Sequence, residues 1–222
     1  MKIYRPLWNE GALLSPQQFQ QQSAWEAFTN AGVSALSTPF PLGVESVELD
    51  DELLSSGRIQ VRALRLWLPD GTLVDTLNSD IPPPPRELNP GELAGQDSVT
   101  LLLALPLMQP GIINVQKTAS VPERPLRYRE EWVSLPDVFG SEEESVAVAH
   151  FNLALRFGHE NNESWQTCSV SRLVRDGHGG WRQDASFIPP MALFSASAML
   201  RERLVLLNRQ LRSRRQRLMS MR

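Results

Sequence analysis

The chain has 222 residues, of which 41% are hydrophobic, and a formal net charge of −3 from 22 basic and 25 acidic side chains. This length allows one large domain, or one domain with an appendage. A charge so close to zero gives no overall field to attract nucleic acid or an anionic membrane surface, so neither is an expected partner.

The first predicted element is a helix that begins after Ser15. Ser15 is a good helix cap, Pro16 suits the first helical position, and Gln18 has the spacing of a capping box. We expect this helix to end near Ala31, because Gly32 follows. The residues before it contain no apolar run of signal-peptide length, and nowhere does the chain contain about 18 consecutive apolar residues. We therefore expect no direct membrane insertion.

A strand and hairpin are predicted from residue 58 onward. Apolar side chains occupy odd positions in residues 58–63 and even positions in residues 64–68. A phase change of this kind indicates one extra residue at a β-bulge. Pro69-Asp70-Gly71 has the composition of a tight turn, so we predict a hairpin that returns through residues 72–77.

Further strands are predicted along the middle of the chain. The longest pattern, residues 146–157, places apolar side chains on every odd position and indicates one continuous strand. No alternation of strands and helices points to a parallel sheet. Many short strands separated by proline and glycine instead predict a mainly β chain folded as an antiparallel β-sandwich. The other predicted strands are residues 99–105, 112–116 and 127–135, followed by a hairpin of residues 166–174 with Trp181.

The C-terminal residues, from Leu193 onward, have the leucine spacing of a coiled-coil helix. Leucines recur at alternating intervals of four and three residues, with Arg214 in one gap, and the pattern is intact at Arg222. Such a seam needs a partner helix, so the chain oligomerises here, belongs to a longer bundle, or both. The residues assigned to trimerisation are Leu200, Leu204, Leu207, Leu211 and Leu218.

Residues typical of catalysis or metal binding are scarce. The sequence has no glycine-rich phosphate loop, nucleophile elbow or zinc-binding helix motif. His150, His159 and His178 have no ligand spacing, and a single cysteine, Cys168, fits a packing residue in a reducing compartment. Glu142, Glu143 and Glu144 are contiguous, which suits a solvated loop better than paired catalytic carboxylates. We therefore predict no enzyme activity, catalytic residue, metal or cofactor, although a hydrolase with carboxylates from separate strands stays open.

Four segments carry a resemblance to a known family. Residues 7–20 read LWNEGALLSPQQFQ, and residues 39–44, 68–72 and 184–190 supply further matches in the same order. They resemble TssK, also called ImpJ or VasE, a family of the bacterial type VI secretion baseplate. The position before Phe19 is commonly histidine in that family and is Gln18 here, so no histidine role is carried over.

The resemblance implies a β-sandwich shoulder like that of siphophage receptor-binding proteins over residues 1–190. It also implies the start of a trimeric helical neck over residues 191–222, and a C-terminal head absent from this chain. The implied function is that of a cytoplasmic adaptor in a contractile injection machine. Its shoulder would bind the wedge proteins TssF and TssG, and its head would link to TssL and TssM at the inner membrane.

The wedge-binding region is assigned to the N-terminal motif, with two alternatives open. The motif could instead pin the N-terminus onto the sandwich or onto a neighbouring subunit. The phage likeness also allows a carbohydrate- or receptor-binding module, and one or two of the six tryptophans are expected at interfaces. The residues assigned to partner binding are Trp8, Glu10, Gly11, Leu13, Leu14, Pro16, Gln17 and Phe19.

Overall fold

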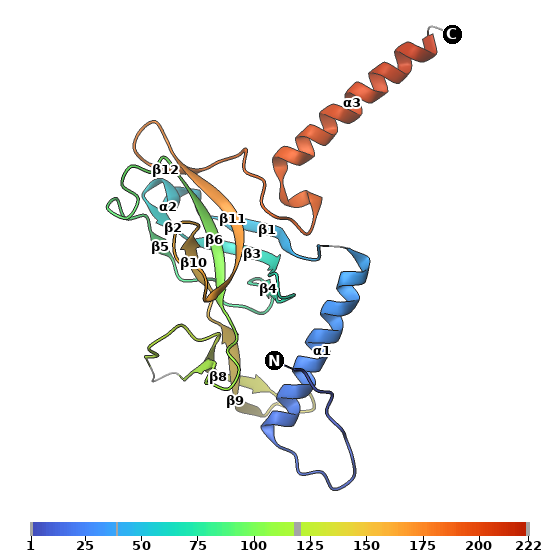
Figure 1. The fold of residues 1–222 in the computed structure, drawn as a ribbon, viewed down its shortest axis with the longest axis vertical. Coiled ribbons are helices and arrows are strands. Elements are labelled where there is room, and N and C mark those ends of the chain that lie inside the picture. Colours follow the sequence, from blue (N-terminus) through green and yellow to red (C-terminus); the bar gives the residue numbers. More distant parts are fainter. Residues whose placement is uncertain (1, 39, 118–120, 221–222) are drawn as a thin grey trace.

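A computed structural model describes residues 2–38, 40–117 and 121–220. The chain is mainly antiparallel sheet, with one long helix near each end (Figure 1). Pro39 and the chain end at Arg222 lie outside the described residues. The elements are α1 Pro16–Ser37, β1 Gly43–Leu49, α2 Asp51–Ser55, β2 Arg58–Ile59, β3 Val61–Trp67, β4 Leu73–Asp75, β5 Arg86–Glu87, β6 Ser98–Pro106, β7 Val115–Gln116, β8 Tyr128–Pro136, β9 Glu143–Phe151, β10 Ala154–Phe157, β11 Trp165–Arg175, β12 Trp181–Gln183, η1 Phe194–Ala196 and α3 Ala198–Ser220.

Two antiparallel sheets share one hydrophobic core. One has the strand order β1-β3-β4, and the other has the order β10-β6-β11-β12. Leu64 and Leu66 from the first sheet and Leu103, Leu105 and Phe157 from the second are fully buried in the same cluster. The predicted antiparallel β-sandwich, with an N-terminal and a C-terminal helix, is therefore confirmed.

The predicted β-bulge lies in β3, where it pairs with β1. Leu49 pairs with Val61, but Glu48, the residue before it in β1, pairs with Ala63. Arg62 is thus the extra residue, and the buried side chains change from odd to even positions beyond it. The bulge explains the phase change in the sequence.

The predicted hairpin through Pro69-Asp70-Gly71 is also confirmed, although its second strand is short. Gly71 has φ +83°, and its N–H donates to Leu68 O at 2.9 Å. The strand β4 ends at Asp75, whose Oδ1 accepts the N–H of Leu77 at 3.0 Å. This local turn competes with the ladder and stops the strand.

The helix α1 is longer than predicted. It continues through Gly32 to Ser37, because one glycine inside a helix costs only about 1 kcal/mol relative to alanine. Thr38 is extended, at φ −148° and ψ 137°, as expected for a residue that precedes a proline. The residue before proline, and not Gly32, ends the helix.

The prediction of one strand over residues 146–157 is wrong. The strand β9 pairs with β8, whereas β10 pairs with β6 in the main sandwich. Between them, the side-chain amide of Asn152 donates to Leu126 O at 2.8 Å, and its backbone N–H donates to Arg127 O at 3.0 Å. The chain therefore passes from the β7-β8-β9 sheet to the main sandwich while apolar and polar side chains continue to alternate. The hydrophobic periodicity could not reveal this break. The predicted strand at residues 112–116 is reduced to β7.

Candidate partner-binding surfaces

The N-terminal segment, residues 2–15, folds back along α1 (Figure 1). The N–H of Tyr4 donates to Gln21 Oε1 at 3.3 Å, and the guanidinium of Arg5 lies 4.7 Å from the ring centre of Trp25. Few polar contacts hold this segment, so its position depends on side-chain packing against the helix.

A turn connects this segment to α1. The N–H of Ala12 donates to Asn9 O at 3.2 Å, and Gly11 between them has φ +77°, a conformation that favours glycine. At the helix start, Gln18 Oε1 accepts the N–H of Ser15 at 2.9 Å, as the capping-box spacing predicts. Gln18 thus helps to cap the helix.

All the residues assigned to partner binding are exposed. The rings of Trp8 and Phe19 contact each other, with centroids 6.1 Å apart, yet remain 49% and 55% exposed. Leu13 is 89% exposed, and no residue of α1 is buried. Of the assigned residues, only Trp8 and Phe19 are brought together in a ring contact. Together with its exposed leucines, the motif forms an apolar surface that the described residues leave uncovered.

The C-terminal helix α3 projects from the sandwich as a single helix (Figure 1). It begins at Ala198, so Leu193 lies before the helix and the leucine seam starts at Leu200, which is half-buried. The buried Ser197 caps it, because its Oγ accepts the N–H of Leu200 at 3.3 Å. The other seam leucines are 50% to 68% exposed: Leu204, Leu207, Leu211 and Leu218.

Two of the sequence motifs, far apart in the chain, meet at the base of α3. The N–H of Val44 donates to Pro190 O at 2.8 Å, and the N–H of Ala192 donates to Val44 O at 3.0 Å. Gly43 has φ +114°, and a Cβ there would lie 2.6 Å from the backbone of Pro190 and Met191. Residues 40–44 and 184–190 therefore form the junction between sandwich and helix.

A carboxylate orders the second segment of this junction, residues 184–190. Asp184 accepts hydrogen bonds from Ser186 Oγ at 2.7 Å, from the N–H of Ser186 at 2.9 Å and from Arg172 Nε at 2.7 Å. These donors stabilise the ionised form and lower the pKa of Asp184 to about 2. The carboxylate is thus charged throughout the neutral range and holds residues 184–186 against β11.

A third motif, residues 68–72, lies where the sandwich meets α1. The buried Arg127 donates to Asp70 Oδ2 at 2.9 Å, to Thr72 Oγ1 at 2.8 Å and to Pro106 O at 3.1 Å. A Cβ at Gly71 would lie 3.1 Å from the Cβ of Ala31 in α1. A cleft of about 680 Å³ lies between α1 and this turn. The motif residues thus join the hairpin turn to Arg127 and to α1.

The three histidines lie apart. His150 Nε2 is 3.2 Å from Glu131 Oε2, the ring of His159 stacks on Phe157, and His178 lies in the turn between β11 and β12. Within residues 2–38, 40–117 and 121–220, no group of three or more histidine, cysteine, aspartate or glutamate side chains is placed to hold a metal ion.

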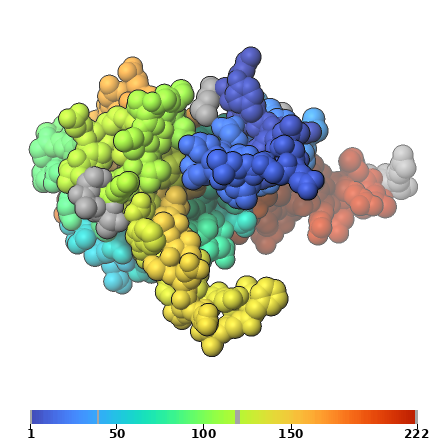
Figure 2. All heavy atoms as spheres, turned by 90° about the horizontal axis from the view of Figure 1, so that it is seen from below, coloured from blue at the N-terminus to red at the C-terminus, as the bar shows by residue number. Residues whose placement is uncertain are grey.

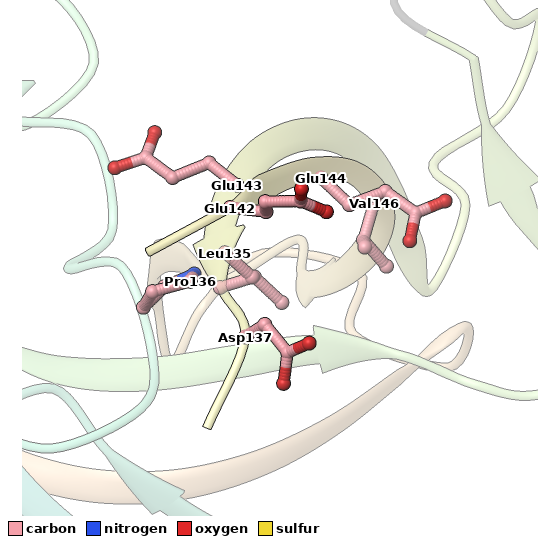
Figure 3. Close-up of a pocket in the computed structure, with 7 residues that line it drawn as sticks. All are labelled: Leu135, Pro136, Asp137, Glu142, Glu143, Glu144 and Val146. Carbon is pink, nitrogen blue, oxygen red and sulfur yellow. The ribbon is translucent and has the colours of Figure 1, made fainter. Parts of the chain in front are cut away.

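Two other groups have side chains that can take part in chemistry: the thiol of Cys168 and the three consecutive glutamates that begin at Glu142. Cys168 is buried among apolar side chains, and desolvation raises the pKa of its thiol to about 11, which disfavours the nucleophilic thiolate. Glu142 is exposed in the turn, but Glu143 and Glu144 belong to β9, so the predicted loop is only partly correct. All three carboxylates line a shallow hollow beside Asp137 and Leu135 (Figure 3).

A strand over residues 127–135 was predicted and corresponds to β8, but its pairing with β9 in a hairpin with an exposed tip was not predicted. At its tip, Val138 and Phe139 are 93% and 99% exposed, and Trp132 on β8 is 61% exposed. Trp8 and Trp132 are the most exposed tryptophans, in line with the expectation that one or two lie at interfaces. The available signal was an adjacent apolar pair, Val138 and Phe139, between the turn residues Asp137 and Gly140.

The sequence is similar to that of known type VI secretion proteins. The sequence profile of the family described as bacterial type VI secretion, VC_A0110, EvfL, ImpJ, VasE matches residues 18–222. Over 107 residues the chain is 34% identical to the type VI secretion system baseplate component TssK1 of Pseudomonas aeruginosa. This alignment covers 48% of the chain and 23% of the relative, so it spans under a quarter of that protein's length. Of the helices in the described part, none is long and apolar enough to cross a membrane.

Solved structures extend the likeness to the whole chain. A chain of the type VI secretion TssK-TssF-TssG baseplate subcomplex, determined by cryo-electron microscopy, matches with a TM-score of 0.94 and 44% identity, over 100% of this chain and 73% of that chain. The baseplate complex gives 0.92 and 44%, over 100% and 49%. TssK from the EAEC type VI secretion system, bound to a nanobody, gives 0.78 and 40%, over 92% and 46%. The chain therefore belongs to the bacterial type VI secretion family that includes ImpJ and VasE.

Proposed function

We propose that the protein is a TssK-type structural component of the type VI secretion baseplate, and that its shoulder binds the TssF–TssG wedge. The observation that carries this proposal is the match of the whole chain, at 44% identity and a TM-score of 0.94, to a chain of the TssK-TssF-TssG subcomplex. Identity of this extent supports a shared surface as well as a shared fold. The function is mechanical, and no catalytic step is part of it.

The exposed surfaces suggest that the two ends of the chain bind different partners. The turn that precedes α1 lies at the bottom of Figure 1 and the projecting end of α3 at its top, so the two are at opposite ends of the molecule in that view. We assign wedge binding to the N-terminal motif and trimerisation to the leucine seam of α3. Residues 1–190 then form the shoulder and residues 191–222 the start of the neck.

The remaining part of the adaptor role is assigned to a C-terminal head. In the proposed assembly, the head links the baseplate to TssL and TssM at the cytoplasmic face of the inner membrane. A rigid sandwich suits such an adaptor, because it holds the wedge-binding surface at a fixed angle to the trimer axis.

Replacing both Trp8 and Phe19 with alanine tests the wedge-binding role of the N-terminal motif. Both rings are about half exposed and contact each other, so their loss removes apolar surface from the interface at little cost to the sandwich core. We expect the dissociation constant for the purified TssF–TssG complex to rise roughly a hundredfold, as for a pair of aromatic hot spots. Biolayer interferometry measures this change.

Phe28→Ala is the matched control, because Phe28 is also 55% exposed on α1 but lies outside the motif. It should bind the wedge complex like the unmodified protein. Unchanged wedge binding of the double variant, together with a lower melting temperature, would show that the motif only pins the N-terminus.

A further inference from the structure

The strands β8 and β9 form a hairpin that extends away from the sandwich. They pair continuously over nine residues each, from Tyr128 opposite Phe151 to Pro136 opposite Glu143, with no register shift. On the other side of β8, the short strand β7 reaches only Tyr128 and Arg129. The outer part of the hairpin, yellow in Figure 2, protrudes from the rest of the molecule.

This hairpin has no core of its own. No residue of β8 or β9 is buried, and a two-stranded hairpin alone is only marginally stable in water. In the sheet that contains it, the order is β7-β8-β9, so among the described strands none covers the outer edge of β9. The interior of β9 has neither a proline nor a bulge, two of the devices that protect a free edge, and its glutamates lie at its first two positions. These features are those of a strand that accepts another strand.

The tip of the hairpin presents two apolar side chains on an ordered turn. The N–H of Asp137 donates to Glu142 O at 2.8 Å, and the N–H of Phe139 donates to Asp137 Oδ1 at 2.9 Å. Val138 and Phe139 are nonetheless almost completely exposed. An ordered turn that holds apolar side chains in solvent gains free energy when a partner covers them.

The net negative charge of the hairpin favours a basic partner. Its only arginine or lysine is Arg129, against six acidic residues. Four of these, Asp137 and the three consecutive glutamates from Glu142, line a hollow of about 460 Å³ that Leu135 and Val146 also line, as Figure 3 shows. A segment rich in lysine or arginine would complement this charge, with apolar stems over Leu135 and Val146. The six acidic residues are Glu130, Glu131, Asp137, Glu142, Glu143 and Glu144.

We propose that the β8–β9 hairpin is a second docking arm, and that a basic, extended segment of the wedge complex adds as a strand along the outer edge of β9. Main-chain hydrogen bonds supply affinity, and contacts with the acidic side chains fix the register. Val138 and Phe139 insert into the partner at the tip. This inference rests on the proposed function and adds a site and a partner chemistry to it.

Two pairs of substitutions test the arm with the intact protein and the purified TssF–TssG complex as the probe. Val138→Ser with Phe139→Ser removes the apolar tip, and Glu142→Lys with Glu144→Lys reverses the charge. Each pair should raise the dissociation constant roughly tenfold or more. The charge-reversed pair should also weaken the dependence of binding on salt concentration, since fewer attractive ion contacts remain to be screened.

Val121→Ser and Glu163→Lys are the matched controls. Val121 is 98% exposed in another loop, and Glu163 is exposed in the loop before β11, so both should bind like the unmodified protein. Hydrogen exchange supplies a second readout. The amides of β9 should exchange more slowly in the complex than in the free protein. In the complex, the outward-facing N–H groups of β9 donate hydrogen bonds to the added strand.

The possible outcomes separate the arm from the proposed function. If both pairs bind the wedge complex as tightly as the unmodified protein, the arm is refuted and the N-terminal docking surface stands. If the unmodified protein does not bind the complex at all, the proposed function fails, and the arm fails with it. Slower exchange of β9 at higher protein concentration, without TssF–TssG, would show that a second copy covers the edge and would also overturn the inference.

Discussion

Replacing Leu204 and Leu207 with alanine is expected to convert a trimer into monomers. Both side chains are about half exposed on α3, and no residue of that helix is buried. In a coiled coil they become core residues of three helices at once. Each leucine-to-alanine change in such a core costs about 2–5 kcal/mol, so the loss exceeds what a short neck segment can tolerate. Light scattering should report one third of the original mass.

Val205→Ala with Leu206→Ala is the matched control for the neck. These two side chains are adjacent to the seam leucines in sequence, and 49% and 56% exposed, but lie on other faces of α3. Their removal should leave the mass unchanged. Equal masses for both double variants at all concentrations would contradict the assignment of the seam.

Gly43→Ala is expected to destabilise the sandwich strongly. The glycine has φ +114°, and a Cβ would lie 2.6 Å from the backbone atoms of Pro190 and Met191. Neither the backbone strain nor the clash can be relieved by a side-chain rotation, so the β1 contact with Pro190 must separate. We expect the free energy of unfolding to fall by about 2–5 kcal/mol, measured by urea denaturation.

The control for Gly43 is Gly91→Ala, which places a methyl group in open space. No atom lies within 4 Å of the position a Cβ would take there, and its φ is not in the left-handed region. Its denaturation midpoint should differ little from that of the unmodified protein. A midpoint for Gly43→Ala as high as that of Gly91→Ala would show that residues 184–192 are not anchored on β1.

Local sequence signals predicted much of the fold. The phase change in residues 58–68 predicted a bulge, because a one-residue insertion shifts every later side chain to the other face, and the structure places the extra residue at Arg62. The turn composition of Pro69-Asp70-Gly71 and the leucine spacing of α3 were equally direct. Periodicity does not say which strand is the neighbour, however. The sheet change at Asn152 was therefore invisible, since alternation continues through it.

The candidate surfaces were predicted less completely. The exposure of Trp8, Leu13 and Phe19 agrees with a binding role, but only the structure shows that no core covers them. The tip at Val138 and Phe139 was missed because exposure of an apolar pair depends on how far the hairpin reaches from the sandwich. The meeting of Gly43 with Pro190 also depends on tertiary packing, and residues so far apart in sequence carry no local sign of it.

Co-expression of this protein with TssF and TssG, followed by affinity capture and native mass spectrometry, is the most direct test of the adaptor role. The proposed function predicts a captured complex that contains TssF, TssG and three or more copies of this chain. A monodisperse trimer that captures neither protein would contradict wedge binding through this part of the molecule.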